Sequence, residues 1–176
     1  MCGIVAIVSR PSSRPAPLAA DIIAALDRAV AAPTLTESAT IVGELDRALH
    51  GVPGMVALAG RHELIAGIGA RLDQLDGRIA TLEQSLEAGG LSVDDIEAIN
   101  AELLAVRDAT WAVRRDRIRT ANAVADFAGR NAGVAAVAGY LAIQQALSAI
   151  DRMEVRGRDS AGRRGAHAAA HGHHPR

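Results

Sequence analysis

The sequence has very few aromatic residues and no lysine. One Phe, one Trp and one Tyr occur in 176 residues, and all 19 basic side chains are arginine. This bias is typical of a GC-rich coding sequence and carries no information about activity. The length is enough for one well-buried domain, or for a small domain with a long helical appendage.

Several other features are absent. The single cysteine excludes an internal disulfide, and the start of the chain has neither a charged leader nor a small-residue cleavage site. A formal net charge of -1 provides no global field for nucleic acid or an anionic membrane. The longest apolar runs, "VPGMVALAG" and "GVAAVAGYLAI", are shorter than the roughly 20 residues that cross a bilayer. We expect a soluble, cytoplasmic protein without a nucleic-acid or membrane partner.

The first 50 residues change from a strand pattern to a helix pattern. Gly3 to Val8 is a continuous apolar run, which predicts one buried β-strand within residues 1–10. Residues 11–17, "PSSRPAP", are rich in proline and predict a linker. Apolar residues then recur every four positions, which predicts a helical pair over residues 18–50, interrupted at Pro33 and restarted by Thr36 with Glu37.

Residues 52–130 have the strongest periodic pattern. Apolar residues from Ile65 to Leu86, and again from Ile96 to Val113, alternate steps of three and four. The segment "AGGLS" between them predicts a turn, so we expect a long antiparallel helical hairpin. The arginine run from Arg114 to Arg119 is interpreted as a solvated face of this hairpin, and Trp111 as a packing residue beside its seam.

A further helix and a tail complete the chain. Residues 134–162 predict a helix that ends in a turn at "RGRDSAG", and residues 163–176 predict a disordered tail. The four histidines of the tail, between His167 and His174, have no carboxylate or thiolate beside them, so we expect no metal site and no cofactor.

Cys2 is the most reactive candidate in the chain. If Met1 is removed, the thiol and the α-amine of Cys2 lie on one residue, and the amine can take the proton of the thiol at neutral pH. Gly3 leaves space for a substrate beside it. Either Cys2 is a nucleophile of this kind, or it is a small apolar residue near the terminus.

Two segments resemble one enzyme family. "MCGIVAIV" is similar to the start of the class II, N-terminal nucleophile (Ntn hydrolase) glutamine amidotransferases. "MEVRGRDSAG", residues 153–162, matches seven of ten positions of a turn that follows the first helix of that fold. The glutamine:fructose-6-phosphate amidotransferases (isomerizing) are most similar, and the amidophosphoribosyltransferases are the nearest rival.

The resemblance implies a chemistry and a fold. Cys2 would form a glutamyl thioester and release ammonia to a sugar phosphate, as in amino sugar biosynthesis, while Arg156, Gly157, Asp159 and Ser160 would bind substrate or order the loop near the nucleophile. The expected fold is mainly α, with one N-terminal β-strand of a truncated α+β glutaminase sandwich and the helical hairpin inserted.

Residues that would bind glutamine in the family do not follow the turn. We therefore expect the N-terminal fragment of a longer amidotransferase, inactive alone. The alternative is a non-enzymatic helical-hairpin interaction protein that dimerises through residues 52–130.

Overall fold

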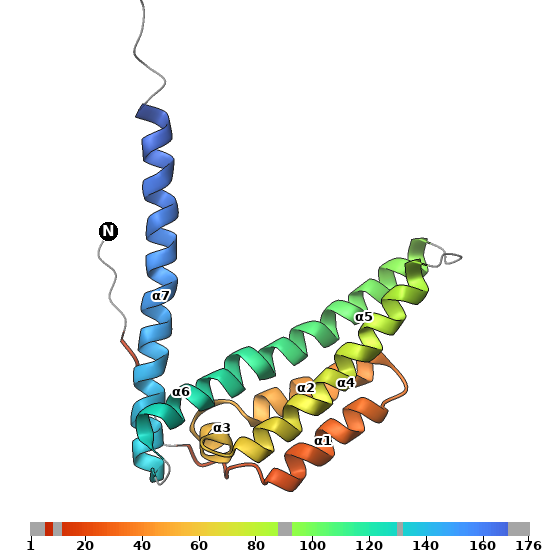
Figure 1. The fold of residues 1–176 in the computed structure, drawn as a ribbon, viewed down its shortest axis with the longest axis horizontal. Helices are drawn as coiled ribbons and strands as arrows, with labels where there is room; N and C mark the ends of the chain where they lie inside the picture. The colour runs from red at the N-terminus through yellow and green to blue at the C-terminus, as the bar shows by residue number, and fades with distance from the viewer. Residues whose placement is uncertain (1–5, 9–11, 88–92, 130–131, 169–176) are drawn as a thin grey trace, which may run out of the picture. The chain divides into compact units, whose positions relative to one another are not determined.

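The computed structural model describes residues 6–8, 12–87, 93–129 and 132–168, and the side chains of residues 87, 93–94 and 153–168 lie outside the description. The described part is all-α (Figure 1). Its elements are α1 (Ala19–Ala31), α2 (Leu35–Ala48), α3 (Gly51–Leu58), α4 (His62–Glu87), α5 (Val93–Ala112), the π-helical segment η1 (Val113–Ile118), α6 (Arg119–Ala128) and α7 (Val134–Ala168).

The expected N-terminal strand is not found, and the prediction of a truncated α+β sandwich is wrong. Residues 6–8 form no regular structure, residues 1–5 lie outside the description, and no strand occurs in the residues that the structure describes. A single strand has no neighbour to accept and donate its backbone hydrogen bonds, so the apolar run Gly3 to Val8 cannot form a stable sheet alone.

The chain divides into two compact units, which we describe separately. One unit is Pro11–Leu141, which contains α1 to α6 and the first turns of α7. The other combines Met1–Arg10 with Ala142–Arg176. The unit Pro11–Leu141 contains the hydrophobic core, and we refer to it as the bundle.

The start of α2 depends on a side-chain cap. The Thr34 hydroxyl accepts a hydrogen bond from the backbone N–H of Glu37 at 3.1 Å, so the helix begins at Leu35, one residue before the predicted Thr36. A Thr followed three residues later by Glu is a capping-box pattern. Pro33 follows the extended residue Ala32, which ends α1 as the sequence predicts.

The end of α1 is capped by an arginine from α4. Arg78 donates to the backbone carbonyls of Val30 at 2.8 Å and Ala32 at 3.0 Å, and the buried hydroxyl of Ser38 donates to the carbonyl of Ala29 at 2.8 Å. The last carbonyls of a helix have no partner within the helix, so these bonds satisfy groups that would otherwise be buried without one. They join α1, α2 and α4 at one end of the bundle.

The two arms of the expected hairpin do not form a separate insertion. The helix α4 packs mainly against α1, whereas α5 packs mainly against α2, and α1 packs against α2. The seam residues Ile68, Leu72 and Leu75 of α4 are fully buried in a core shared with α1 and α2. An aliphatic stripe is stabilised by the area it removes from water, and three neighbouring helices cover more of it than one.

The short helix α3 crosses the end of α2 in direct backbone contact. A Cβ atom added at Gly54 would lie 1.7 Å from the carbonyl oxygen of Leu49. Met55 and Leu58 of α3 are buried in the main core. Gly54 is therefore the residue that allows α3 to dock on the bundle.

The helix α7 begins in the bundle. Val137 and Leu141 are buried in the main core, and the Tyr140 ring stacks on Phe127 with centroids 6.1 Å apart. By length and composition alone, the stretch Val134–Arg152 qualifies as a membrane span, with a mean hydropathy of 1.3, a test that core helices of soluble proteins also pass.

Replacing Gly54 by alanine should lower the free energy of unfolding by about 3 kcal/mol, because the backbone of Leu49 cannot yield to a methyl group. The matched control is Gly77→Ala, since the space around Gly77 in α4 is open and alanine favours a helix by about 1 kcal/mol. Urea denaturation of both variants measures the difference. Equal stabilities would contradict the close contact between α3 and α2.

Candidate interaction surface

The residues that the resemblance implicates in glutamine chemistry lie outside the description, either entirely or in their side chains. Cys2 lies outside the described residues. Arg156, Gly157, Asp159 and Ser160 lie within α7, and their side chains are outside the description. The backbone at residues 156–162 is helical, whereas the family pattern requires a turn there. The turn expected at these residues is therefore replaced by a helix.

The part of the chain that the structure describes contains no group of three or more His, Cys, Asp or Glu side chains that could hold a metal ion. A pocket of about 80 Å³ beside α3 and α6 is lined by alanine, valine and glycine, including Val56, Ala125 and Val137. This lining has no charged side chain to orient an amino acid or a sugar phosphate.

The most distinctive surface lies on the long helix formed by α5, η1 and α6, which runs without a break from Val93 to Ala128. Ion pairs join this helix to α4. Arg107 contacts Glu83 at 2.7 Å, and Arg114 contacts Asp73 at 2.7 Å and Asp76 at 2.9 Å. These side chains are largely exposed, so each pair contributes less than about 1 kcal/mol to stability.

A less exposed ion pair joins the same helix to α2. The side chains of Arg117 and Asp46 are 16% and 18% exposed, and Nε of Arg117 lies 2.9 Å from Oδ1 of Asp46. The Nε–H group donates to the backbone carbonyl of Asp46 at 3.3 Å, and a terminal nitrogen donates to Oδ2 at 2.9 Å. Oδ1 is buried beside the positive charge but accepts no hydrogen bond. The negative charge of the Asp46 carboxylate is consequently compensated by the positive charge of Arg117.

The π-helical segment brings Arg117 to this position. From Val113 through Arg117 to Ala121, two successive steps of four replace the alternation of three and four. A π turn accommodates the additional residue, so the buried face continues from Val113 to Ala121 and Val124. The predicted solvated arginine run is thus divided: Arg114 pairs with α4, and Arg117 is directed at α2.

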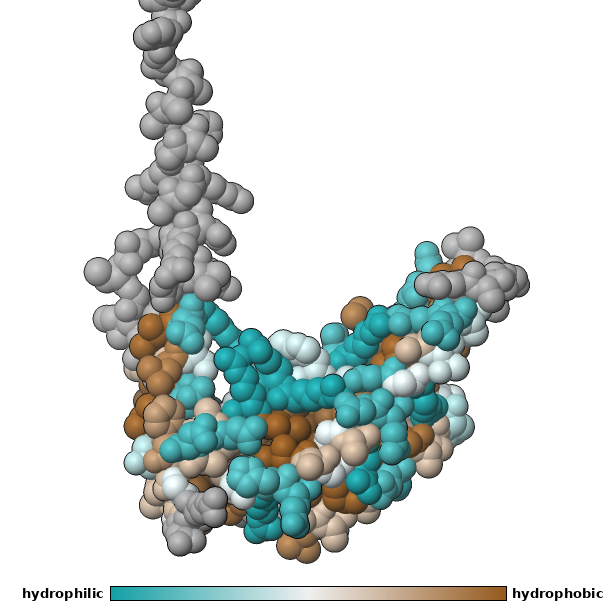
Figure 2. Space-filling view, in the orientation of Figure 1, coloured by the Kyte–Doolittle hydropathy of each residue, from teal (hydrophilic) through white to brown (hydrophobic). Residues whose placement is uncertain are grey.

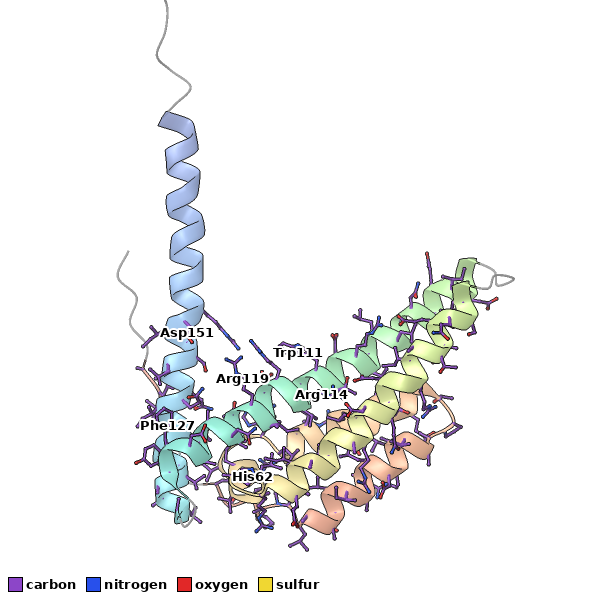
Figure 3. All side chains as sticks on the ribbon, in the orientation of Figure 1. His62, Trp111, Arg114, Arg119, Phe127 and Asp151 are labelled. Atoms are coloured by element: carbon purple, nitrogen blue, oxygen red, sulfur yellow. The ribbon has the colours of Figure 1, made fainter. Side chains whose placement is uncertain are left out.

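The opposite side of the helix exposes apolar side chains. Trp111 and Leu104 are 58% and 60% exposed, so Trp111 is not the packing residue that the sequence analysis predicted. Trp111 lies on the side of α5 away from α4, whereas Arg114 is directed towards α4 (Figure 3). We call the residues on this side, which are spaced alternately by four and three, the outer stripe. They are Glu97, Ala101, Leu104, Asp108, Trp111 and Arg115.

The surroundings of the outer stripe are polar. Charged and polar side chains cover most of the visible surface along α5 and α4, and apolar side chains show between the two helices (Figure 2). An exposed tryptophan and leucine one heptad apart on such a surface are typical of a protein contact, where tryptophan and arginine contribute disproportionately to affinity.

Charge is distributed unevenly along the same helix. Residues 93–102 contain four carboxylates and no arginine, whereas residues 103–119 contain five arginines and two aspartates. The helix dipole favours acidic residues at the start and basic residues at the end. The helix dipole does not explain why the apolar side chains of Leu104 and Trp111 are exposed to solvent. Within the described residues, neither Glu97 nor Arg115 has an ion pair or a hydrogen bond from its side chain.

The sequence carries a signal for the outer stripe that is weaker than the signal for the buried seam. Steps of four and three from Glu97 to Arg115 run parallel to the buried seam, but only two of the six residues are large and apolar, and the stronger seam through Leu103 and Val106 dominates the pattern.

Comparisons of this chain with models of protein families, with curated proteins and with solved structures each gave no match. The function proposed below consequently depends on the geometry of the chain itself.

The ion pair of Arg117 should contribute more to the free energy of unfolding than the ion pairs of Arg114. Replacing Arg117 by methionine leaves the carboxylate of Asp46 buried without its counter-charge, and we expect a loss of about 2 kcal/mol in the free energy of unfolding. Arg114→Met is the matched control and should cost less than about 1 kcal/mol, since Asp73 and Asp76 remain hydrated. Chemical denaturation that ranks the two variants in the reverse order would contradict this description.

Proposed function

We propose that this chain is a non-enzymatic helical interaction protein, and that the outer stripe of α5 and η1 is its binding surface. The observation that carries the proposal is the exposure of Trp111 and Leu104 on a helix whose opposite face is fully buried. The exposed part of the Trp111 side chain does not stabilise the core. Its burial against a partner would contribute a favourable free energy to binding. We also propose that the protein works in the cytoplasm.

The bundle supports this surface with a rigid frame. Val106 and Val113, on the side of the long helix opposite the outer stripe, are fully buried. This burial fixes the rotation of the helix about its axis, and the ion pairs of Arg107, Arg114 and Arg117 add to it. A preorganised surface binds with less loss of conformational entropy than a flexible one.

Site-specific photo-cross-linking tests the proposal. With benzoylphenylalanine in place of Trp111, irradiation of the producing cells should give one discrete adduct, identified by mass spectrometry, that the second substitution Leu104→Glu removes. Gln74, an exposed residue of α4, is the matched control position and should give no discrete adduct. The same pattern from both positions, or no adduct from position 111, would overturn the proposal.

A second candidate, the glutamine amidotransferase activity, is supported by the sequence resemblance at Cys2 and residues 153–162. The two proposals predict different results with 6-diazo-5-oxo-norleucine, a glutamine analogue that alkylates N-terminal nucleophilic thiols. If the chain is an interaction protein, intact-mass measurement after treatment should show no adduct on Cys2 and no ammonia should be released from glutamine. A stoichiometric adduct on Cys2, after loss of Met1, would favour the enzyme.

A further inference from the structure

We infer that the partner of the outer stripe is a second copy of this chain. The α5 helices of the two copies run antiparallel, and the two-fold axis passes between them at the level of residue 106. This inference rests on the proposed function, because it assigns an occupant to the same surface. The six residues of the stripe form three pairs, and the two members of each pair lie at equal distances before and after residue 106. The outermost pair has opposite charges, and the next pair combines a small residue with a large one.

Antiparallel pairing about residue 106 brings each stripe residue opposite a different one. Glu97 faces Arg115 of the second copy, Ala101 faces Trp111, and Leu104 faces Asp108. A two-fold axis repeats every contact, so that residue i meets j and j meets i. Both sides of the interface are therefore formed by the outer stripe alone.

The contacts that result are complementary in size and charge. Ala101 is the smallest residue of the stripe and Trp111 the largest, so the indole ring of one copy can lie over the helix of the other. Glu97 and Arg115 have opposite charges and no other partner in the described structure. Arg107 and Arg114, by contrast, already pair with carboxylates of α4.

The same residues make a parallel arrangement of the two α5 helices unfavourable. It would bring Glu97 to Glu97, Asp108 to Asp108 and Arg115 to Arg115 at one level. Like charges in direct opposition destabilise an interface and exclude the wrong orientation. The carboxylates on the stripe similarly oppose binding to nucleic acid or to an anionic membrane, where phosphates would face Glu97 and Asp108.

Asp108 limits the affinity of the antiparallel pair. It lies opposite Leu104 close to the two-fold axis, where a carboxylate loses water without gaining a counter-charge from the stripe. A single polar residue in a helical seam fixes the register and the orientation at a cost in stability. We expect a dimer in the micromolar range rather than an obligate one.

A charge-swap experiment tests the inference on the full chain by sedimentation equilibrium. Glu97→Arg and Arg115→Glu should each weaken self-association by about 100-fold, because each variant creates two like-charge contacts per dimer. An equimolar mixture of the two variants should associate as a heterodimer about as tightly as the unmodified chain does, since both contacts then join opposite charges. Arg28→Glu, at an exposed position of α1, should leave the association unchanged.

A second variant makes the test independent of those charges. Asp108→Ala should tighten the unmodified dimer by about tenfold, because it removes the buried carboxylate. A monomer at all concentrations, two variants that do not associate when mixed, or a weaker dimer with Asp108→Ala would each overturn the inference. If the adduct at position 111 is a different protein, the inference fails but the proposed function is upheld.

Discussion

The burial of one aliphatic stripe of the helix α5–η1–α6 determines which side chains of that helix are presented to water. Leu103, Val106 and Val113 are covered by the bundle. Once this face is buried, helical geometry leaves the side chains half a turn away in solvent, and these include Leu104 and Trp111. The exposed surface is thus a consequence of the core and not a separate feature.

Arginine supplies most of the polar contacts between the helices. Arg78 caps the end of α1, Arg114 reaches two aspartates of α4, and Arg117 compensates the buried carboxylate of Asp46. A planar guanidinium with five donors can serve several backbone and carboxylate oxygens at once, which a lysine cannot do. With few aromatic side chains, the bundle is specified by aliphatic packing together with these directional bonds.

Periodicity predicted the helices well and their partners less well. The steps of three and four through Ile68, Leu72 and Leu75 identified α4, but a seam does not say which helix will cover it, and the structure uses α1 and α2 as well as α5. The strand predicted at Gly3 to Val8 was wrong because an apolar run of that length needs neighbouring strands, which the rest of the chain does not supply among its described residues. The close approach of Gly54 to the backbone of Leu49 and the π-helical segment are details of backbone geometry that the alternation of three and four does not predict.

In the proposed dimer, Trp111 lies in the interface between two copies of the chain, so its fluorescence reports directly on that interface. Trp111 is the only tryptophan, so the emission of the protein reports on this one position. In dilute solution the emission should be that of a hydrated indole. If the dimer forms, the emission should shift to shorter wavelength as the protein concentration rises, and added salt should reverse this shift because exposed charge pairs are screened. An emission maximum that stays at the hydrated position at every concentration would contradict the proposed dimer.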